Sequence, residues 1–132
     1  MRSAAEILRD ATTIALVGAS PRPGRPSQGV MRYLLAQGYR VIPVNPICDE
    51  VLGIPCVPSL AAIHEPVDLV DVFRREEHAA GLAREAAAIG AGAFWLQLGL
   101  RSPEARRVAL ESGMDYVEDA CTAVVHRLEV RE

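Results

Sequence analysis

Residues 12–27 read TTIALVGASPRPGRPS and predict a buried strand that leads through a proline-rich loop into a helix. Thr12–Val17 is an almost continuous apolar run, which is typical of a strand covered on both faces of a sheet. Residues 19–26 include three prolines, which remove backbone donors and fix φ, so this segment is predicted to be a loop. Ser27 then stands where a helix N-cap is expected, and apolar residues recur at helical spacing until Gly38.

The same alternation of strands and helices continues along the chain. Further strands are predicted at Arg40–Val44, Val67–Phe73, Ala93–Gln97 and Met114–Val117, and helices at Glu76–Ile89, Pro103–Ser112 (capped by Ser102) and Ala120–Val130. Such alternation favours parallel strand pairing with right-handed crossovers. We therefore expect an α/β fold in which residues 1–132 form a single doubly wound, Rossmann-like domain. Its five-stranded parallel sheet is predicted to have the order 3-2-1-4-5, with helices on both faces.

The composition excludes several classes of protein. The 132 residues carry a formal net charge of −3, which argues against a nucleic-acid-binding module. No apolar run is long enough for a membrane span, and without a signal-peptide pattern we expect a cytoplasmic protein. All 14 basic residues are arginine, which excludes P-loop and pyridoxal-phosphate chemistry because both need a lysine. This bias, with Asn45 as the single asparagine, is typical either of a thermostable protein or of a GC-rich genome.

The cysteines and histidines show no ligand spacing. Cys48, Cys56 and Cys121 form no C-x-x-C pair, and the three histidines are scattered along the chain. The pattern therefore indicates neither a metal site nor a disulfide. The aspartates likewise show no evident acid–base pair, so the sequence assigns no catalytic residue.

The loop after the first strand is the most informative candidate site. Ligands of doubly wound sheets bind beyond the carboxyl ends of the strands, beside the first strand. A helix N-terminus with nearby arginines favours an anion such as a phosphate group. The candidate residues of this loop are Gly18, Ala19, Ser20, Arg22, Arg25 and Ser27. The alternative interpretation is an ordinary loop, stiffened by proline, whose arginines are merely solvated.

Two enzyme motifs fit this loop poorly. The dinucleotide fingerprint G-x-G-x-x-G would need a glycine in place of Ser20, and the second strand leads into Asn45 where an acid would bind the NAD ribose. The nucleophile elbow G-x-S-x-G would need a glycine in place of Arg22. Two further candidate contacts at the same edge of the sheet are Gln97, which ends the fourth strand, and Arg74, which follows the third.

Several motifs together resemble the stand-alone bacterial CoA-binding protein family, which is related to the N-terminal CoA-binding domain of the succinyl-CoA synthetase α subunit. They are VGASP at 17–21, RPS at 25–27, GYRVIPVNP at 38–46, VDVFR at 70–74 and WLQLG at 95–99. Each motif is weak alone, but the combination is fairly specific. The resemblance covers residues 11–128.

The resemblance implies a domain that holds CoA at the carboxyl ends of the strands, with its phosphates at residues 18–27. Further contacts would come from Pro43, Asn45 and Pro46 on the second loop, and from Val72, Phe73 and Arg74 on the third. In the synthetase, catalysis needs a histidine on another domain and a second subunit, which 132 residues cannot include. We therefore expect a non-catalytic module for CoA or an acyl-CoA, with any protein partner left open. The alternative is an NAD(P)- or flavin-dependent oxidoreductase with a degenerate fingerprint.

Overall fold

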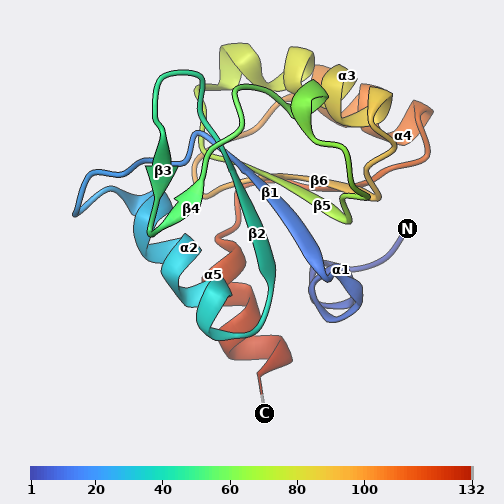
Figure 1. Cartoon of the computed structure of the whole chain (residues 1–132). Helices are drawn as coiled ribbons and strands as arrows, with labels where there is room; N and C mark the ends of the chain where they lie inside the picture. Colours follow the sequence, from blue (N-terminus) through green and yellow to red (C-terminus); the bar gives the residue numbers. More distant parts are fainter. Residues whose placement is uncertain (132) are drawn as a thin grey trace.

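Helices and strands alternate through the computed structural model, which describes residues 1–131 (Figure 1). The elements are α1 (Ala4–Asp10), β1 (Thr13–Val17), α2 (Pro26–Ala36), β2 (Arg40–Val44), β3 (Glu50–Val51), β4 (Ile54–Pro55), η1 (Leu60–Ala62), β5 (Leu69–Val72), η2 (Glu76–His78), α3 (Ala79–Ala88), β6 (Ala93–Leu96), α4 (Pro103–Glu111), β7 (Asp115–Val117), α5 (Thr122–Val125) and the π-helical segment η3 (His126–Val130). Within these residues, no helix is both long and apolar enough to cross a membrane.

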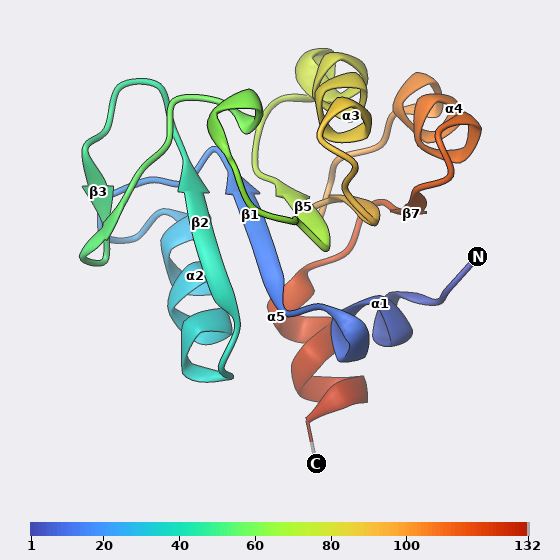
Figure 2. The ribbon, with the colours of Figure 1, turned by 45° about the vertical axis from the view of Figure 1, so that its right-hand side comes forward.

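The predicted fold class is confirmed. Strands β2, β1, β5, β6 and β7 form a parallel sheet in that order, and the short hairpin β3–β4 lies beyond its β2 edge. Helices α3 and α4 cover one face of the sheet, and α1, α2 and α5 cover the other (Figure 2). Side chains of each strand alternate between these layers, so that Phe94 packs under α3 and α4 while Trp95 packs on the opposite face.

The predicted strand order was wrong, and Pro43 supplies the physical reason. The third predicted strand, β5, pairs with β1 and not with β2, so the order is 2-1-3-4-5 in the numbering of the five predicted strands. The carbonyl of Pro43 points away from β1 and accepts a hydrogen bond from Val57 N–H at 3.0 Å. The proline nitrogen faces the same outer side and cannot donate to another strand, which favours an edge position for β2.

Some element boundaries also differ from the prediction. Ser27 is not the N-cap of α2, because Arg25 occupies that position and Pro26 begins the helix. A proline at the first helical position has its φ already set for the helix, so the helix begins two residues earlier than expected. The same arrangement at α4 was predicted correctly: Ser102 caps the helix by accepting a hydrogen bond from Ala105 N–H at 3.0 Å.

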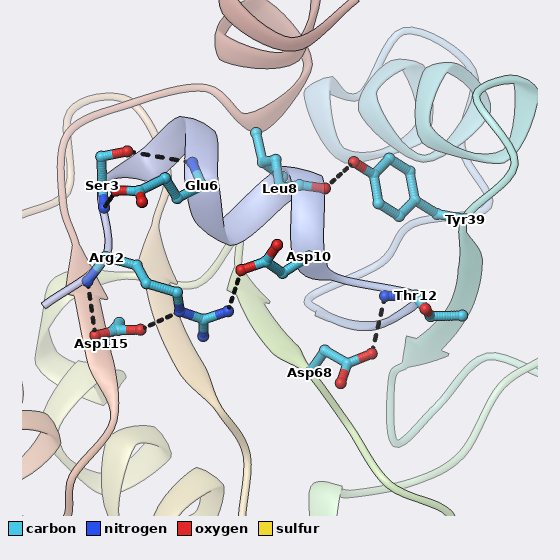
Figure 3. A network of polar contacts seen from close by, with 9 residues as sticks. All are labelled: Arg2, Ser3, Glu6, Leu8, Asp10, Thr12, Tyr39, Asp68 and Asp115. Atoms are coloured by element: carbon cyan, nitrogen blue, oxygen red, sulfur yellow. Dashed lines mark hydrogen bonds and ion pairs between the residues drawn. The ribbon is translucent and has the colours of Figure 1, made fainter.

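The side chains of Arg2 and Asp68 hold the amino ends of β7 and β1 (Figure 3). Arg2 Nε donates to Asp115 Oδ2 at 2.7 Å, which ties the N-terminus to β7. One oxygen of Asp68 accepts hydrogen bonds from the backbone N–H groups of Thr12 and Thr13, at 2.9 and 2.8 Å. These bonds fix the start of β1, and thereby the position at which its carboxyl end delivers the next loop.

Candidate functional site

A cleft of about 1220 Å³ opens at the carboxyl ends of β1, β2, β5 and β6. Its walls come from the loops that follow these four strands, together with the start of α2 and one residue before α5. The predicted site residues that line it are Gly18, Ala19, Ser20, Arg22, Arg25, Ser27, Asn45, Pro46, Phe73, Arg74 and Gln97. The fold therefore brings together residues from four separate loops.

Pro43 and Val72, by contrast, do not line the cleft. Both lie within strands and are buried, and the Val72 side chain packs in the apolar layer beneath α3. Pro43 and Val72 belong to the strands that lead into the cleft loops: Asn45 follows directly on β2, and Phe73 on β5. A direct ligand contact remains a prediction for these two residues.

Gly18 allows the first loop to cross close to the loop that follows β5. Its φ is +85°, and a Cβ at this position would lie 2.5 Å from the Phe73 carbonyl oxygen and 3.2 Å from Arg74 Cδ. Gly18 N–H donates to Val44 O at 3.1 Å, and Phe73 N–H donates to Val17 O at 2.8 Å. Any side chain here would force the two loops apart, so the floor of the cleft depends on a glycine at this position.

Asn45 joins the second loop to the first. Its Nδ2 donates to the Ala19 carbonyl at 2.8 Å, while its Oδ1 accepts from Ile47 N–H at 2.9 Å. The second bond is the local turn that asparagine readily forms. Both functional groups of the side chain are therefore engaged in shaping the cleft.

Ser20 has a comparable role within the first loop. Its Oγ accepts a hydrogen bond from Arg22 N–H at 3.1 Å, which turns the chain toward α2. Gln28, from the first turn of α2, donates through Nε2 to the Pro21 carbonyl at 3.0 Å and holds the loop against the helix. The loop is thus shaped by side chains as well as by its prolines.

Three arginines contribute positive charge to the cleft; we call Arg22, Arg25 and Arg74 the cleft arginines. All three are exposed, and within residues 1–131 none has a carboxylate at ion-pair distance. Arg75 also lines the cleft but lies 3.7 Å from Glu77. Guanidinium groups without a carboxylate partner can donate forked hydrogen bonds to phosphate oxygens.

Beneath the cleft lies a buried polar cluster that the sequence did not reveal. Thr122 Oγ1 donates to Asp71 Oδ2 at 2.9 Å, and Gln97 Nε2 donates both to Asp71 Oδ1 and to Thr122 Oγ1. Burial raises the pKa of Asp71 to about 7, although the bonds from Gln97 and Thr122 lower it. Gln97 is only 4% exposed, so its amide chiefly supports the floor of the cleft.

Other residues at the cleft were missed as contacts by sequence reasoning. Ile47 and Leu98 are 93% and 73% exposed, although such apolar side chains are usually buried. Cys48 and Cys121 also line the cleft. Ile47 and Leu98 follow the Asn-Pro and Trp-Leu-Gln motifs directly, so their position next to predicted contacts was the available signal.

Comparisons with known proteins identify the family of this chain. Residues 12–127 match a sequence family described as "CoA binding domain". The chain is 44% identical over 121 residues to an uncharacterized protein, YneT, of Bacillus subtilis, covering 92% of this chain and 90% of that protein. A solved structure of a hypothetical protein from Pyrococcus horikoshii OT3 superposes with a TM-score of 0.91 and 40% identity, covering 94% of this chain and 87% of that one.

A larger protein contains a similar unit. The apo dinucleotide-forming acetyl-coenzyme A synthetase 1 of Ca. Korarchaeum cryptofilum matches 84% of this chain with a TM-score of 0.72 and 27% identity. The matched part is 26% of that protein, so most of the synthetase has no counterpart here. From the family match over residues 12–127 and the similarity to YneT along almost its whole length, the chain belongs to the CoA-binding domain family.

Proposed function

We propose that this protein binds coenzyme A or an acyl-CoA in the cleft at the carboxyl ends of the strands. The observation that carries the proposal is the set of cleft arginines, which lack carboxylate partners within residues 1–131 and face the cleft of a CoA-binding domain. CoA has a 3′-phosphate and a pyrophosphate, and both need cationic or N–H donors. Arg22 and Arg25 flank the first loop, and the N-terminus of α2 adds a favourable dipole.

The pantetheine arm would follow the apolar part of the cleft. Phe73 is half-buried in the wall, and Ile47 and Leu98 present exposed apolar surface on two other loops. Covering such surface with a ligand removes it from water, at about 25 cal/mol per Å². This supplies a physical reason for two strongly exposed aliphatic side chains at the mouth of the cleft.

The alternative, a nicotinamide or flavin oxidoreductase, has weaker support from the geometry. The acid that would bind the NAD ribose is replaced by Asn45, and both polar groups of Asn45 are already used within the protein. Asp71, the buried carboxyl group next to the cleft, is bonded to Gln97 and Thr122. We therefore propose that the protein is a binding module for CoA. In this proposal, no acid–base pair of the chain acts on the bound CoA.

A ligand panel tests this proposal directly. CoA, dephospho-CoA, NADH, NADPH and FMN are compared by thermal shift and by isothermal titration calorimetry. A ligand at about 100 times its dissociation constant stabilises the folded state by about 2.7 kcal/mol. We expect CoA to give this shift and dephospho-CoA a smaller one; a response only to a nicotinamide or flavin would overturn the proposal in favour of the oxidoreductase.

The Arg25→Ala variant tests the phosphate end of the site. Loss of a charge-assisted contact should weaken CoA binding by about 1–3 kcal/mol. Arg32→Ala is the matched control, because Arg32 is an exposed arginine of α2, the helix that begins directly after Arg25, and does not line the cleft. Equal affinities of the two variants in calorimetry would show that Arg25 is only solvated.

A further inference from the structure

Two of the three cysteines lie next to one another at the edge of the cleft. The Sγ atoms of Cys48 and Cys56 are 3.4 Å apart. A disulfide bond is about 2.0 Å long, so the two sulfur atoms are about 1.4 Å from bonding distance. Cys48 lines the cleft, whereas Cys56 does not. One thiol of the pair therefore faces the cleft, and the other does not.

The β3–β4 hairpin keeps this pair together (Figure 1). Glu50 pairs with Pro55 in the antiparallel ladder, and Cys56 N–H extends it by donating to Asp49 O at 2.9 Å. Both cysteines also pack against the apolar layer that includes α2. Their proximity is thus set by backbone pairing and packing on each side of the pair.

The two thiols differ in their surroundings. The Cys56 thiol donates its hydrogen bond to Cys48 Sγ, so Cys48 is the acceptor. Burial, followed by the bond to Cys48, raises the pKa of Cys56 to about 12. Cys56 therefore keeps its proton while both cysteines are reduced. Cys48, whose Sγ donates to Glu50 O at 3.1 Å, lines the cleft and is the thiol of the pair that a disulfide in the cleft can reach.

We propose, building on the CoA binding proposed above, that the Cys48–Cys56 pair is a dithiol that reduces disulfides of CoA held in the cleft. The thiolate of Cys48 attacks one sulfur of CoA–S–S–CoA, forms a Cys48–S–S–CoA mixed disulfide and releases the first CoA as its thiolate. Cys56 then gives up its proton and attacks Cys48 Sγ, which releases the second CoA. The pair loses two electrons and two protons, and one CoA disulfide becomes two CoA thiols.

Charge makes the reaction selective for CoA. Asp49 and Glu50 line the cleft beside Cys48 and repel anionic disulfides that have no other hold on the protein. A CoA disulfide would be held by the cleft arginines through its phosphates, which offsets this repulsion. Exchange with CoA disulfide should be about tenfold faster than with glutathione disulfide, because a bound reactant is present at high effective concentration.

The experiment uses the full-length protein, reduced and freed of reductant, and exposes it to CoA disulfide. Released CoA thiol is measured over time, and proteolysis with mass spectrometry locates each product. For the native protein we expect two CoA released per chain and a Cys48–Cys56 disulfide. Cys56→Ser should stop at the mixed disulfide on Cys48 with one CoA released, and Cys48→Ser should release none.

Two comparisons show whether the cleft directs the reaction. Arg25→Ala should lose the roughly tenfold preference for CoA disulfide over glutathione disulfide, while Arg32→Ala should keep it. An adduct on Cys121, or equal rates with both disulfides, overturns the inference. Titration of CoA into the protein kept reduced by a phosphine tests the proposed function separately. Binding without thiol exchange defeats the dithiol inference alone, whereas exchange without CoA binding contradicts the proposed function.

Discussion

Arg2, at the amino end of the sheet, and the cleft arginines, at its carboxyl end, differ in how their charge is paired. At the amino end, Arg2 lies between two carboxylates, 3.2 Å from Asp10 and 2.7 Å from Asp115 (Figure 3). At the carboxyl end, the cleft arginines have no carboxylate at ion-pair distance within residues 1–131. The pairing of Arg2 ties the N-terminal segment to β7. The cleft arginines, which have no carboxylate partner within residues 1–131, stay available to an anion from outside the protein.

The backbone shows the same contrast. At the amino end, Asp68 satisfies two N–H groups and fixes the start of β1. At the carboxyl end, Gly18 has a positive φ and passes close to the Phe73 carbonyl, which leaves no room for a side chain. Contacts at the amino end thus stabilise the fold. At the carboxyl end, a left-handed backbone conformation at Gly18 is needed to form the cleft.

The largest expected effect comes from Gly18→Ala. The new Cβ would lie 2.5 Å from the Phe73 carbonyl oxygen in a backbone conformation that L residues avoid. We expect the free energy of unfolding to fall by about 3 kcal/mol or more, because steric overlap adds to the strain of the left-handed conformation. Urea denaturation measures this change.

Gly24→Ala is the matched control for that variant. Gly24 has the same φ of +85°, but a Cβ there would meet nothing within 4 Å. Only the conformational strain remains, so the expected loss is about 1 kcal/mol. Equal losses for the two variants would show that the close approach of the loops at Gly18 has no energetic weight.

A smaller effect is expected from Asp71, the buried carboxyl group beneath the cleft. Its pKa is raised to about 7, so the folded state holds a proton that the unfolded state releases near pH 4. Stability should therefore fall as pH rises from about 4 to about 8, by no more than about 1.4 kcal/mol for each pH unit. Above about pH 8, where the folded state has also released this proton, the contribution no longer changes.

Asp71→Asn isolates that contribution. The amide keeps an oxygen for the bond from Gln97 but does not titrate. Urea unfolding of both proteins across this pH range should give curves that diverge, with the variant gaining relative stability as pH rises. Parallel curves would mean that Asp71 titrates alike in the folded and unfolded states.

Much of the fold could be predicted because its signals are local. The buried run Thr12–Val17 and the Ser102-Pro103 helix start depend only on neighbouring residues, and both form as expected. Strand order depends on which strands pair across long connections, which local patterns do not encode. Pro43 nevertheless gave a usable signal, because a proline in mid-strand favours the sheet edge and thus opposes the central position predicted for β2.

The candidate site was predictable to the extent that it lies on loops after strands. Residues of all four loops meet in one cleft because carboxyl ends of parallel strands share one edge of the sheet. The Asp71–Gln97–Thr122 cluster and the Cys48–Cys56 pair were not predictable, since their members come from different elements or from opposite ends of a hairpin. Such contacts are set by packing, for which the sequence has no fixed spacing.

The smallest expected effects come from removing one arginine at each end of the sheet and measuring both stability and CoA affinity. Arg2→Ala removes a guanidinium from Asp115, whose side chain is 18% exposed, and should lower the free energy of unfolding by about 1 kcal/mol. CoA affinity should stay unchanged, because Arg2 lies at the far end of the sheet.

Arg74→Ala should do the reverse. It should weaken CoA binding while the free energy of unfolding stays within about 0.5 kcal/mol, because exposed residues without partners contribute little to stability. Denaturation and calorimetry on both variants measure the four values. If Arg2→Ala weakened binding, or Arg74→Ala lowered stability as much as Arg2→Ala, the division of charge between a structural end and a ligand-binding end would fail.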